Sequence, residues 1–335
     1  MTRSAVRSSA TAALMVAVPL ALLALLAVTV LSASDQRVVL SFFVTLSLAL
    51  SIQTFSGSTG IMSFGHVAFM GVGAYAATAL LVPAGVLATF APGIPDFIAD
   101  LELPLVAVLA MTFVVAGLIA GLVGLVLTRM EGEAMAMATV SLLLIFTTLF
   151  SGLDSLTGGA QGTYAIPEVT TIWIGLAVAV LFVFVSQLFF RSRIGIQLRA
   201  SRSAPLAAES LGVNLRRQRW VAWTLAGAMI GLAGAVWAGY SLAFAPGSFG
   251  FDLTFSLLSA IVVGGLYSVS GTVLGAATLT FLFEVMRRVE DATGVVGLTQ
   301  IATAVVILLI LYRYPIGILG YKELPEILTR RRADW

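Results

Sequence analysis

The stretch from Arg191 to Arg219 reads RSRIGIQLRASRSAPLAAESLGVNLRRQR and is the one long polar interruption in an otherwise apolar chain. Its many arginines are accompanied by a single acidic residue, Glu209. On both sides the sequence returns to long apolar runs. A basic loop between membrane spans stays on the cytoplasmic side, because lysine and arginine are retained there. The stretch therefore predicts the orientation of the whole chain.

A short helix is predicted inside this basic loop. Ser203 can cap its start, Pro205 is tolerated in a first helical turn, and Gly212 suits a left-handed exit. The body, residues 204–211, is about two turns long, and a helix of that length is not stable alone in water. Two interpretations stay open. The helix lies on the surface of its own protein, or it is a docking helix whose small and apolar residues enter a groove of a cytoplasmic partner, namely Leu206, Ala207, Ala208 and Leu211.

The composition is that of a polytopic membrane protein. Of the 335 residues, 59% are hydrophobic and 10% are charged, whereas a soluble domain is about 25% charged. The mean hydropathy is +1.06, and at roughly 20 residues per span the length allows about ten transmembrane or half-membrane helices. The apolar runs are continuous rather than alternating, which excludes a β-barrel. We therefore expect an all-α polytopic membrane protein.

Composition also excludes several functional classes. The chain has no cysteine, which removes thiol catalysis and cysteine-based metal sites, and the single histidine, His66, cannot build a metal site alone. The only lysine, Lys322, follows no glycine-rich loop, so no phosphate-binding motif is present. A net charge of +2 is too small to indicate a nucleic-acid partner. We expect no enzyme, no catalytic residues, no metal and no cofactor in this chain.

The apolar runs predict the course of the chain. With the N-terminus inside, the spans before the basic loop are 12–33, 37–55, 64–90, 103–128, 134–152 and 169–190, and those after it are 219–243, 253–270, 272–287 and 295–313. Both termini are then cytoplasmic. Residues 1–11 form an N-terminal tail, residues 12–320 a transmembrane domain that contains the basic loop 191–219, and residues 321–335 a basic C-terminal tail.

Two segments look broken where a continuous span would run. Glycines and hydroxyl residues interrupt residues 53–75 and again residues 262–276. Backbone that leaves helical geometry at membrane depth must line a cavity or be buried in protein, and paired interruptions in two halves of a transporter indicate a substrate path and an inverted repeat. We therefore predict a translocation path, completed by a third polar segment on the external side, that is lined by Gly60, Ser63, His66, Thr157, Gly158, Gly159, Gly264, Gly265 and Ser268.

Charged groups are scarce inside the predicted spans. Glu284 is the acid nearest to a span interior, and its neighbours Arg287 and Arg288 favour an interfacial ion pair over a proton site. For His66, a helix-start or packing role competes with a role as a pore ligand. Ion-coupled carriers usually need buried carboxylates, so energy for uphill transport is expected to come from another polypeptide. A self-sufficient channel or ion-coupled carrier is the alternative.

Five blocks of the sequence form an ordered series. They are GIMSFGHVAFMGVGAY at 60–75, TGGAQG at 157–162, residues 193–213, residues 226–235 followed by Pro246 and Gly264-Gly265, and Pro-Ile-Gly at 315–317. Over residues 39–320 the series resembles the LivM-type membrane subunit of bacterial ABC importers for branched-chain amino acids. Three departures occur. The first span, before Val39, matches poorly. Ala134 or Met135 stands where relatives commonly carry an aromatic, and Glu209 follows the two alanines of the ATPase-docking motif instead of preceding them.

The resemblance implies a permease domain in the bacterial inner membrane that works by alternating access and performs no chemistry itself. It implies four kinds of partner: a second, LivH-type permease subunit, two cytoplasmic ATPase subunits that bind ATP and magnesium, an external solute-binding protein, and the lipid bilayer. The basic loop 191–219 would be the coupling loop, with the contact residues Arg193, Gly195, Arg199, Ala207, Ala208, Glu209, Leu211 and Gly212. The solute would be a branched-chain amino acid, with urea, a short amide or another small organic solute as alternatives.

Overall fold

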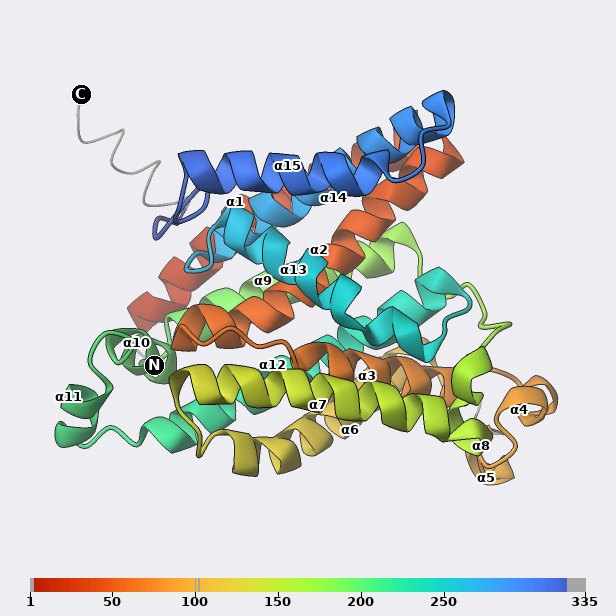
Figure 1. The fold of residues 1–335 in the computed structure, drawn as a ribbon, viewed down its shortest axis with the longest axis horizontal. Helices are drawn as coiled ribbons and strands as arrows, with labels where there is room; N and C mark the ends of the chain where they lie inside the picture. Colours follow the sequence, from red (N-terminus) through yellow and green to blue (C-terminus); the bar gives the residue numbers. More distant parts are fainter. Residues whose placement is uncertain (1–2, 100, 102, 324–335) are drawn as a thin grey trace. The chain divides into compact units, whose positions relative to one another are not determined.

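The computed structural model describes residues 3–99, 101 and 103–323, and these residues are mainly helical (Figure 1). The long helices are α1 Arg3–Val30, α2 Ala33–Thr59, α3 His66–Leu81, α6 Leu105–Leu127, α7 Gly132–Gly152, α9 Ile172–Phe190, α12 Leu215–Ser241, α13 Phe251–Gly264, α14 Val269–Thr293 and α15 Leu298–Arg313. Short elements are α4 Ala84–Phe90, α5 Asp96–Ala99, α8 Asp154–Thr157, η1 Gly159–Gln161, α10 Arg193–Ala200, α11 Pro205–Ser210 and η2 Pro246–Phe249.

The predicted fold class is confirmed. In the described part of the chain, 8 helices are long and apolar enough to cross a membrane, and two apolar helices, α3 and α15, are shorter. Both of these shorter helices have 16 residues, so each rises about 24 Å, less than the roughly 30 Å of a bilayer core. The chain is therefore a polytopic α-helical membrane protein whose apolar helices differ in length.

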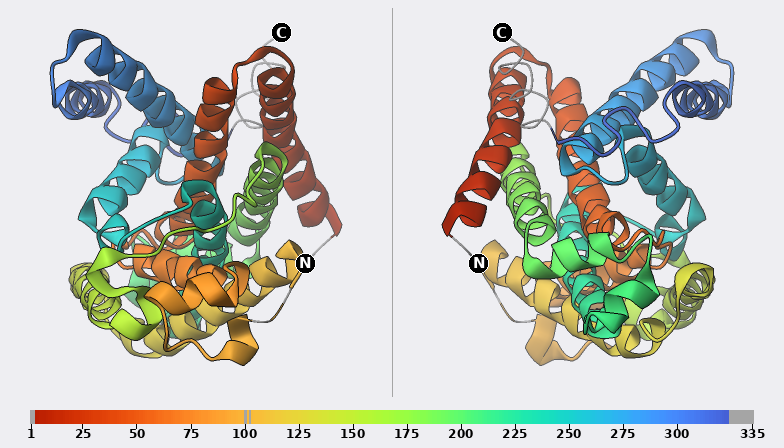
Figure 2. Two further views of the ribbon diagram at one scale, coloured as in Figure 1. Left: turned by 90° about the vertical axis from the view of Figure 1, so that its right-hand side faces the viewer. Right: turned by 90° about the vertical axis from the view of Figure 1, so that its left-hand side faces the viewer.

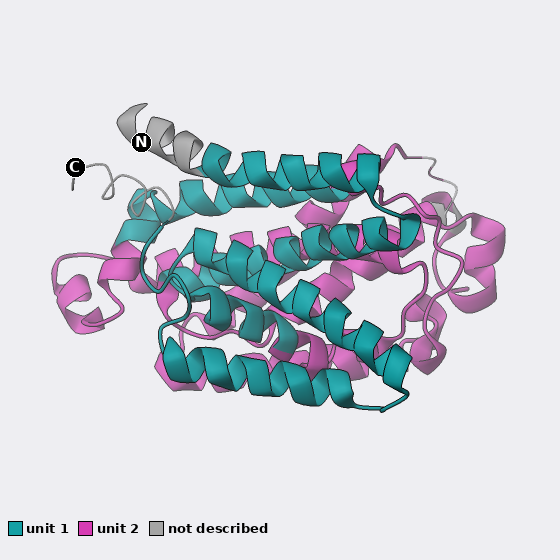
Figure 3. Ribbon diagram, turned by 90° about the horizontal axis from the view of Figure 1, so that it is seen from above, with its two compact units in different colours: residues 1–58, 175–196, 256–335 teal, residues 59–174, 197–255 magenta. Residues whose placement is uncertain are grey.

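The chain forms two compact units, which Figure 3 colours separately. Unit 1 contains residues 1–58, 175–196 and 256–335. Unit 2 contains residues 59–174 and 197–255. Both units are assembled from discontinuous stretches. Residues 60–65, between α2 and α3, fall in unit 2, and residues 265–268, between α13 and α14, fall in unit 1.

Unit 2 is built around α12, which packs against α3 and α6. Small residues allow this close approach, as their spacing indicates for membrane helices. A Cβ added at Gly73 of α3 would lie 1.9 Å from the carbonyl oxygen of Gly231 in α12, and one added at Gly227 would lie 2.3 Å from the Cβ of Ala120 in α6. The glycine stripe of α12 is therefore a packing feature.

Unit 1 contains two helical hairpins, α1 with α2 and α14 with α15, both visible in Figure 2. The buried helix α2 carries hydroxyl groups that find partners inside the unit. Thr54 and Ser186 of α9 form a hydroxyl–hydroxyl hydrogen bond of 2.9 Å. Phe42 of α2 meets Phe281 of α14 with 5.6 Å between the ring centroids. Polar and aromatic contacts thus join α2, α9 and α14.

Three predicted spans have different bounds in the structure. The span 64–90 is wrong as one helix, because α3 ends at Leu81 and Pro83 begins α4; proline disfavours a helical residue before it and lacks the N–H of a helix interior. The spans 253–270 and 272–287 are also wrong in their limits. The helix break lies earlier, between Gly264 and Val269, and α14 continues to Thr293.

Residues 3–11 of the predicted N-terminal tail belong to helix α1. Helix α1 begins at Arg3, well before the expected start at residue 12. Residues 324–335 of the predicted C-terminal tail lie outside the described residues. The cytoplasmic location of both termini and the inverted repeat stay predictions.

Candidate functional site

The basic loop 191–219, which the resemblance predicts to be the coupling loop, contains two helices, of which only the second was predicted. Helix α10 starts after Ser192, whose hydroxyl oxygen accepts a hydrogen bond of 3.1 Å from the Gly195 N–H. A Cβ at Gly195 would lie 2.2 Å from the carbonyl oxygen of Phe189, so the turn from α9 into α10 has no room for a side chain. Gly195 therefore sets the direction in which the loop leaves α9.

Helix α11 has the predicted end but not the predicted start. The residue at its N-cap is Ala204 and no side chain caps it, so the assignment of Ser203 as the cap is wrong. The start is instead held by Pro205, whose fixed φ suits a first turn. At the other end Gly212 has φ +81, and the Val213 N–H donates to the Ala208 carbonyl at 3.1 Å. This left-handed exit confirms the expectation for Gly212.

Helix α11 is exposed. None of its residues is buried, and Leu206 within the helix and Leu211 at its C-cap are 82% and 84% exposed. In Figure 1 the helix lies at the tip of the loop. Pro205 and Ala208 are half-buried, and α11 contacts α12 of its own chain. Both interpretations of α11, a surface helix and a docking helix, therefore stay open.

The rest of the coupling loop is anchored within unit 2. The Gln218 side-chain amide donates to Gln197 Oε1 at 2.5 Å, which joins α10 to α12. The Arg219 side chain, 10% exposed, lies 3.8 Å from the Glu131 carboxylate at the start of α7. At Gly60, a Cβ would lie 3.3 Å from Cγ of Arg202, so the first break lies directly against the loop. These contacts connect the loop to α12, to the start of α7 and to the first break.

The first break lies between α2 and α3. Gly60 has φ +76, which ends α2 in a left-handed conformation. Ser63 Oγ and His66 Nδ1 form a hydrogen bond of 2.6 Å, and both side chains are fully buried. His66 is the first residue of α3, and its ring centroid lies 4.2 Å from that of Trp223 in α12. The helix-start and packing role is therefore confirmed for His66.

The third predicted segment, at Thr157 to Gly159, lies after α7, where α8 ends at Thr157 and η1 begins at Gly159. The Thr157 hydroxyl donates to the Phe150 carbonyl at 2.5 Å, and Gly158 and Gly159 have φ +73 and +56. The first break packs at a different level of α7, because a Cβ at Gly65 would lie 2.8 Å from the Thr139 carbonyl oxygen. Thr139 and Phe150 are separated by roughly 16 Å along the helix axis. The structure therefore does not bring these two parts of the predicted path together.

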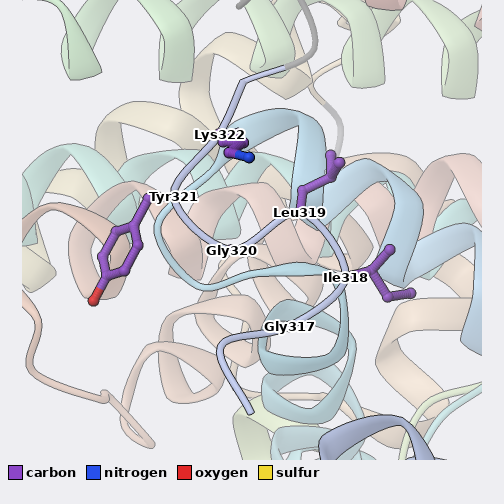
Figure 4. A pocket seen from close by; sticks show the side chains of 6 residues that line it. All are labelled: Gly317, Ile318, Leu319, Gly320, Tyr321 and Lys322. Atoms are coloured by element: carbon purple, nitrogen blue, oxygen red, sulfur yellow. The ribbon is translucent and has the colours of Figure 1, made fainter. Parts of the chain in front are cut away.

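The second break, between α13 and α14, is covered by the C-terminal segment of unit 1. The Ile318 and Leu319 N–H groups donate to the carbonyls of Val263 and Gly264 at 2.9 and 3.0 Å. Ser268 caps α14 by accepting from the Gly271 N–H at 3.0 Å. Figure 4 shows residues 317–322 curving around this place, with Tyr321 on the opposite side from Ile318 and Leu319. The carbonyl groups at the end of α13 are thus bound by the chain itself.

A buried carboxylate that sequence reasoning missed completes this arrangement. Glu323, 6% exposed, accepts hydrogen bonds from the Val269 N–H at 2.7 Å, the Ser270 hydroxyl at 2.6 Å and the Gln187 side chain at 3.1 Å. A negative charge is favoured at this position by the N-terminus of α14. The second break and the start of α14 are thus held by hydrogen bonds within unit 1.

Glu284 belongs to an ion-pair cluster, as the sequence favoured. It accepts from Arg287 Nε at 3.0 Å and from Arg288 Nε at 2.7 Å. Arg288 also pairs with Asp35 at the start of α2. These bonds join the two hairpins of unit 1 at one end, so Glu284 has a structural role.

Comparisons with known proteins place this helical membrane protein in a family. The model of the family described as "Branched-chain amino acid transport system / permease component" matches residues 36–313. The chain belongs to this family of transport permeases, and the resemblance to LivM-type subunits is confirmed.

Three relatives illustrate the breadth of the family. The chain is 25% identical over 236 residues to a probable branched-chain amino acid transport permease, LivH, of Methanocaldococcus jannaschii, which covers 69% of each chain. It is 26% identical over 215 residues to the high-affinity branched-chain amino acid permease LivM of Escherichia coli, covering 53% of this chain and 51% of that protein. It is 25% identical over 263 residues to the nucleoside ABC transporter permease NupB of Lactococcus lactis, covering 69% of each. No solved structure gave a significant match.

Proposed function

We propose that this chain is the permease subunit of an ATP-driven importer for branched-chain amino acids in the bacterial inner membrane. It moves solute by alternating access, and the energy comes from separate ATPase subunits. Membership of the permease family and the eight apolar helices support the general class. The observation that supports the proposal is the exposure of α11, where Leu206 and Leu211 are both more than four-fifths accessible.

The coupling loop is the proposed contact for the ATPases. Helix α11 supplies the exposed apolar surface, α10 connects it to α9, and Arg202 touches the turn at Gly60. A push on α11 therefore reaches the first break through contacts within unit 2. The residues assigned to this role are Arg193, Gly195, Arg199, Ala207, Ala208, Glu209, Leu211 and Gly212.

The proposed assembly contains a second, LivH-type permease subunit, two cytoplasmic ATPase subunits and an external solute-binding protein. ATP and magnesium bind to the ATPases, and this chain holds no cofactor and performs no chemistry. The named relatives are permeases for transport systems, which supports partners of this kind. Solute selection is expected in the binding protein, so the permease itself needs only a weak site.

Branched-chain amino acids are the first substrate candidate, because two of the relatives carry that name. Nucleosides are a second candidate, because NupB matches a longer part of this chain than LivM does. Urea and short amides have no comparable support. The two candidates differ chemically, since an amino acid brings a carboxylate and an ammonium group and a nucleoside brings neither.

Reconstitution tests the proposal. The full chain is incorporated into proteoliposomes with and without the proposed ATPases, sister permease and binding protein, and uptake of labelled leucine and uridine is measured. We expect leucine uptake only in the complete assembly with ATP. Uptake by the chain alone would instead establish a self-sufficient carrier, and uptake of uridine without leucine would establish the nucleoside alternative.

A further inference from the structure

A second candidate site lies in unit 2, where the end of α6 meets the start of α12, at the lower left of Figure 1. A pocket of about 270 Å³ is lined there by Leu125 and Thr128 from the end of α6 and by Asn214, Arg216, Arg217 and Trp220 from the start of α12. None of these residues was assigned to the coupling loop contacts or to the translocation path.

The polar half of the pocket is suited to an anion. Arg216 and Arg217 are exposed, and no acidic partner is found for either among the described residues. The nearby acid Glu131 is placed against Arg219 instead, at 3.8 Å. The two guanidinium groups stand in the first turn of a 27-residue helix, whose N-terminal dipole also favours negative charge. Guanidinium groups bind phosphate well because they offer several donors in one plane.

The apolar half of the pocket continues into the membrane-facing surface of α6. Leu118, Leu122 and Leu125 are all exposed and follow one another at helical spacing, so they form one apolar stripe. This stripe leads directly to Leu125 in the pocket wall. A ligand with a phosphate at one end and an alkyl chain at the other fits both halves.

Trp220 marks the level of the membrane interface. Its indole N–H donates to the Gly121 carbonyl of α6 at 2.8 Å, and its ring lies over Gly124, where a Cβ would be 3.2 Å from Trp220 Cδ1. Tryptophan is enriched where hydrocarbon meets headgroups. The arginines therefore stand at headgroup level and the leucine stripe at acyl-chain level.

We propose that this pocket binds an anionic phospholipid, with its phosphate between Arg216 and Arg217 and an acyl chain along Leu118, Leu122 and Leu125. Basic pockets between transmembrane helices are suited to such headgroups. The pocket is continuous with the apolar stripe through Leu125, which favours a lipid as the ligand. A protein partner would contact the arginines only from the aqueous side. The inference needs no assumption about the transported solute.

Native mass spectrometry of the full chain in detergent tests this proposal. Wild-type protein is titrated with dioleoyl phosphatidylglycerol, dioleoyl phosphatidylcholine and inorganic phosphate, and compared with the variant Arg216→Gln/Arg217→Gln. The control is Arg191→Gln/Arg313→Gln, which removes two arginines from the ends of α9 and α15. Thermal unfolding of each variant verifies that it is folded.

We expect phosphatidylglycerol to bind more tightly than phosphatidylcholine, and the pocket variant to lose roughly tenfold in phosphatidylglycerol affinity. The control should change less than about twofold, because it alters charge without altering the pocket. Unchanged phosphatidylglycerol binding in the pocket variant overturns the proposal, and so does an equal loss in the control, which would reveal unspecific surface charge.

Two further outcomes also overturn it. Displacement of phosphatidylglycerol by millimolar inorganic phosphate, with the same dependence on both arginines, would assign the pocket to free phosphate. Normal lipid binding combined with failed assembly of the pocket variant with its ATPases would assign the arginines to a protein partner.

Discussion

The carboxylate of Glu323 accepts a 2.6 Å hydrogen bond from the hydroxyl of Ser270 and a 3.2 Å bond from its backbone N–H. This pair joins the end of the described chain to the first turn of α14, across 53 positions of sequence. Because the carboxylate is buried, its stabilising effect is not screened by solvent as a surface ion pair would be. The C-terminal segment thereby acts as a cap for the second break.

Replacing Glu323 by alanine is expected to destabilise unit 1. The change leaves the Val269 N–H and the Ser270 groups without their acceptor, at a cost of about 3 kcal/mol. We expect a lower midpoint in thermal unfolding of the detergent-solubilised protein. The matched control is Lys322→Ala, because Lys322 is exposed and adjacent. If Glu323→Ala and Lys322→Ala have the same unfolding midpoint, a capping role is contradicted. The midpoint of Glu323→Gln should lie between the midpoints of these two variants.

Acidic residues on α11 are expected to uncouple transport without unfolding the protein. Leu206→Glu/Leu211→Glu changes two side chains that are more than four-fifths exposed, so stability should stay near that of wild type. Solute-stimulated ATPase activity in the reconstituted complex should fall roughly tenfold, as for loss of a central apolar contact at an interface. The control is Val296→Glu, which changes an equally exposed apolar residue, 93% accessible, in the turn between α14 and α15. Equal activity of both variants would rule out a docking role for α11.

The left-handed exit at Gly212 gives a separate test of the coupling loop. A Cβ there meets nothing within 4 Å, so Gly212→Ala is disfavoured only by its φ of +81, at a cost of about 1 kcal/mol. We expect lower coupling in Gly212→Ala and recovery in Gly212→Asn, since asparagine tolerates this conformation. Both are measured as the ratio of solute uptake to ATP hydrolysis. If asparagine and alanine impair coupling equally, backbone conformation is not the cause.

The helix contact at Gly73 is expected to be intolerant of any side chain. A Cβ at this position would lie 1.9 Å from the Gly231 carbonyl oxygen, so α3 and α12 must separate in Gly73→Ala, at a cost of about 2 kcal/mol. The measurement is the unfolding midpoint in detergent. Gly85→Ala is the control, because Gly85 has nothing within 4 Å and is not held at positive φ. Similar midpoints for the two variants would show that the α3–α12 contact adjusts.

Local patterns in the sequence were sufficient to predict the membrane class, the approximate positions of the helices and the left-handed residue that ends α11. These features depend on apolar run length and on the preferences of single residues, such as the left-handed conformation of Gly212. The start of α11 was predicted wrongly at Ser203, because a serine only caps a helix when the backbone places its oxygen near the free N–H groups. The break after Leu81 was missed because the apolar run continues through Pro83.

The sequence by itself determined a polytopic helical membrane protein with a basic loop and two broken spans, since hydropathy, charge and glycine spacing are all local properties. Only the tertiary structure decided which groups meet at those breaks. Glu323 reaches α14, and Arg202 reaches Gly60, through chain paths that no nearby residue signals. The physical reason is that the free N–H and C=O groups of a broken helix must find partners, but their chemistry does not specify which distant segment provides them.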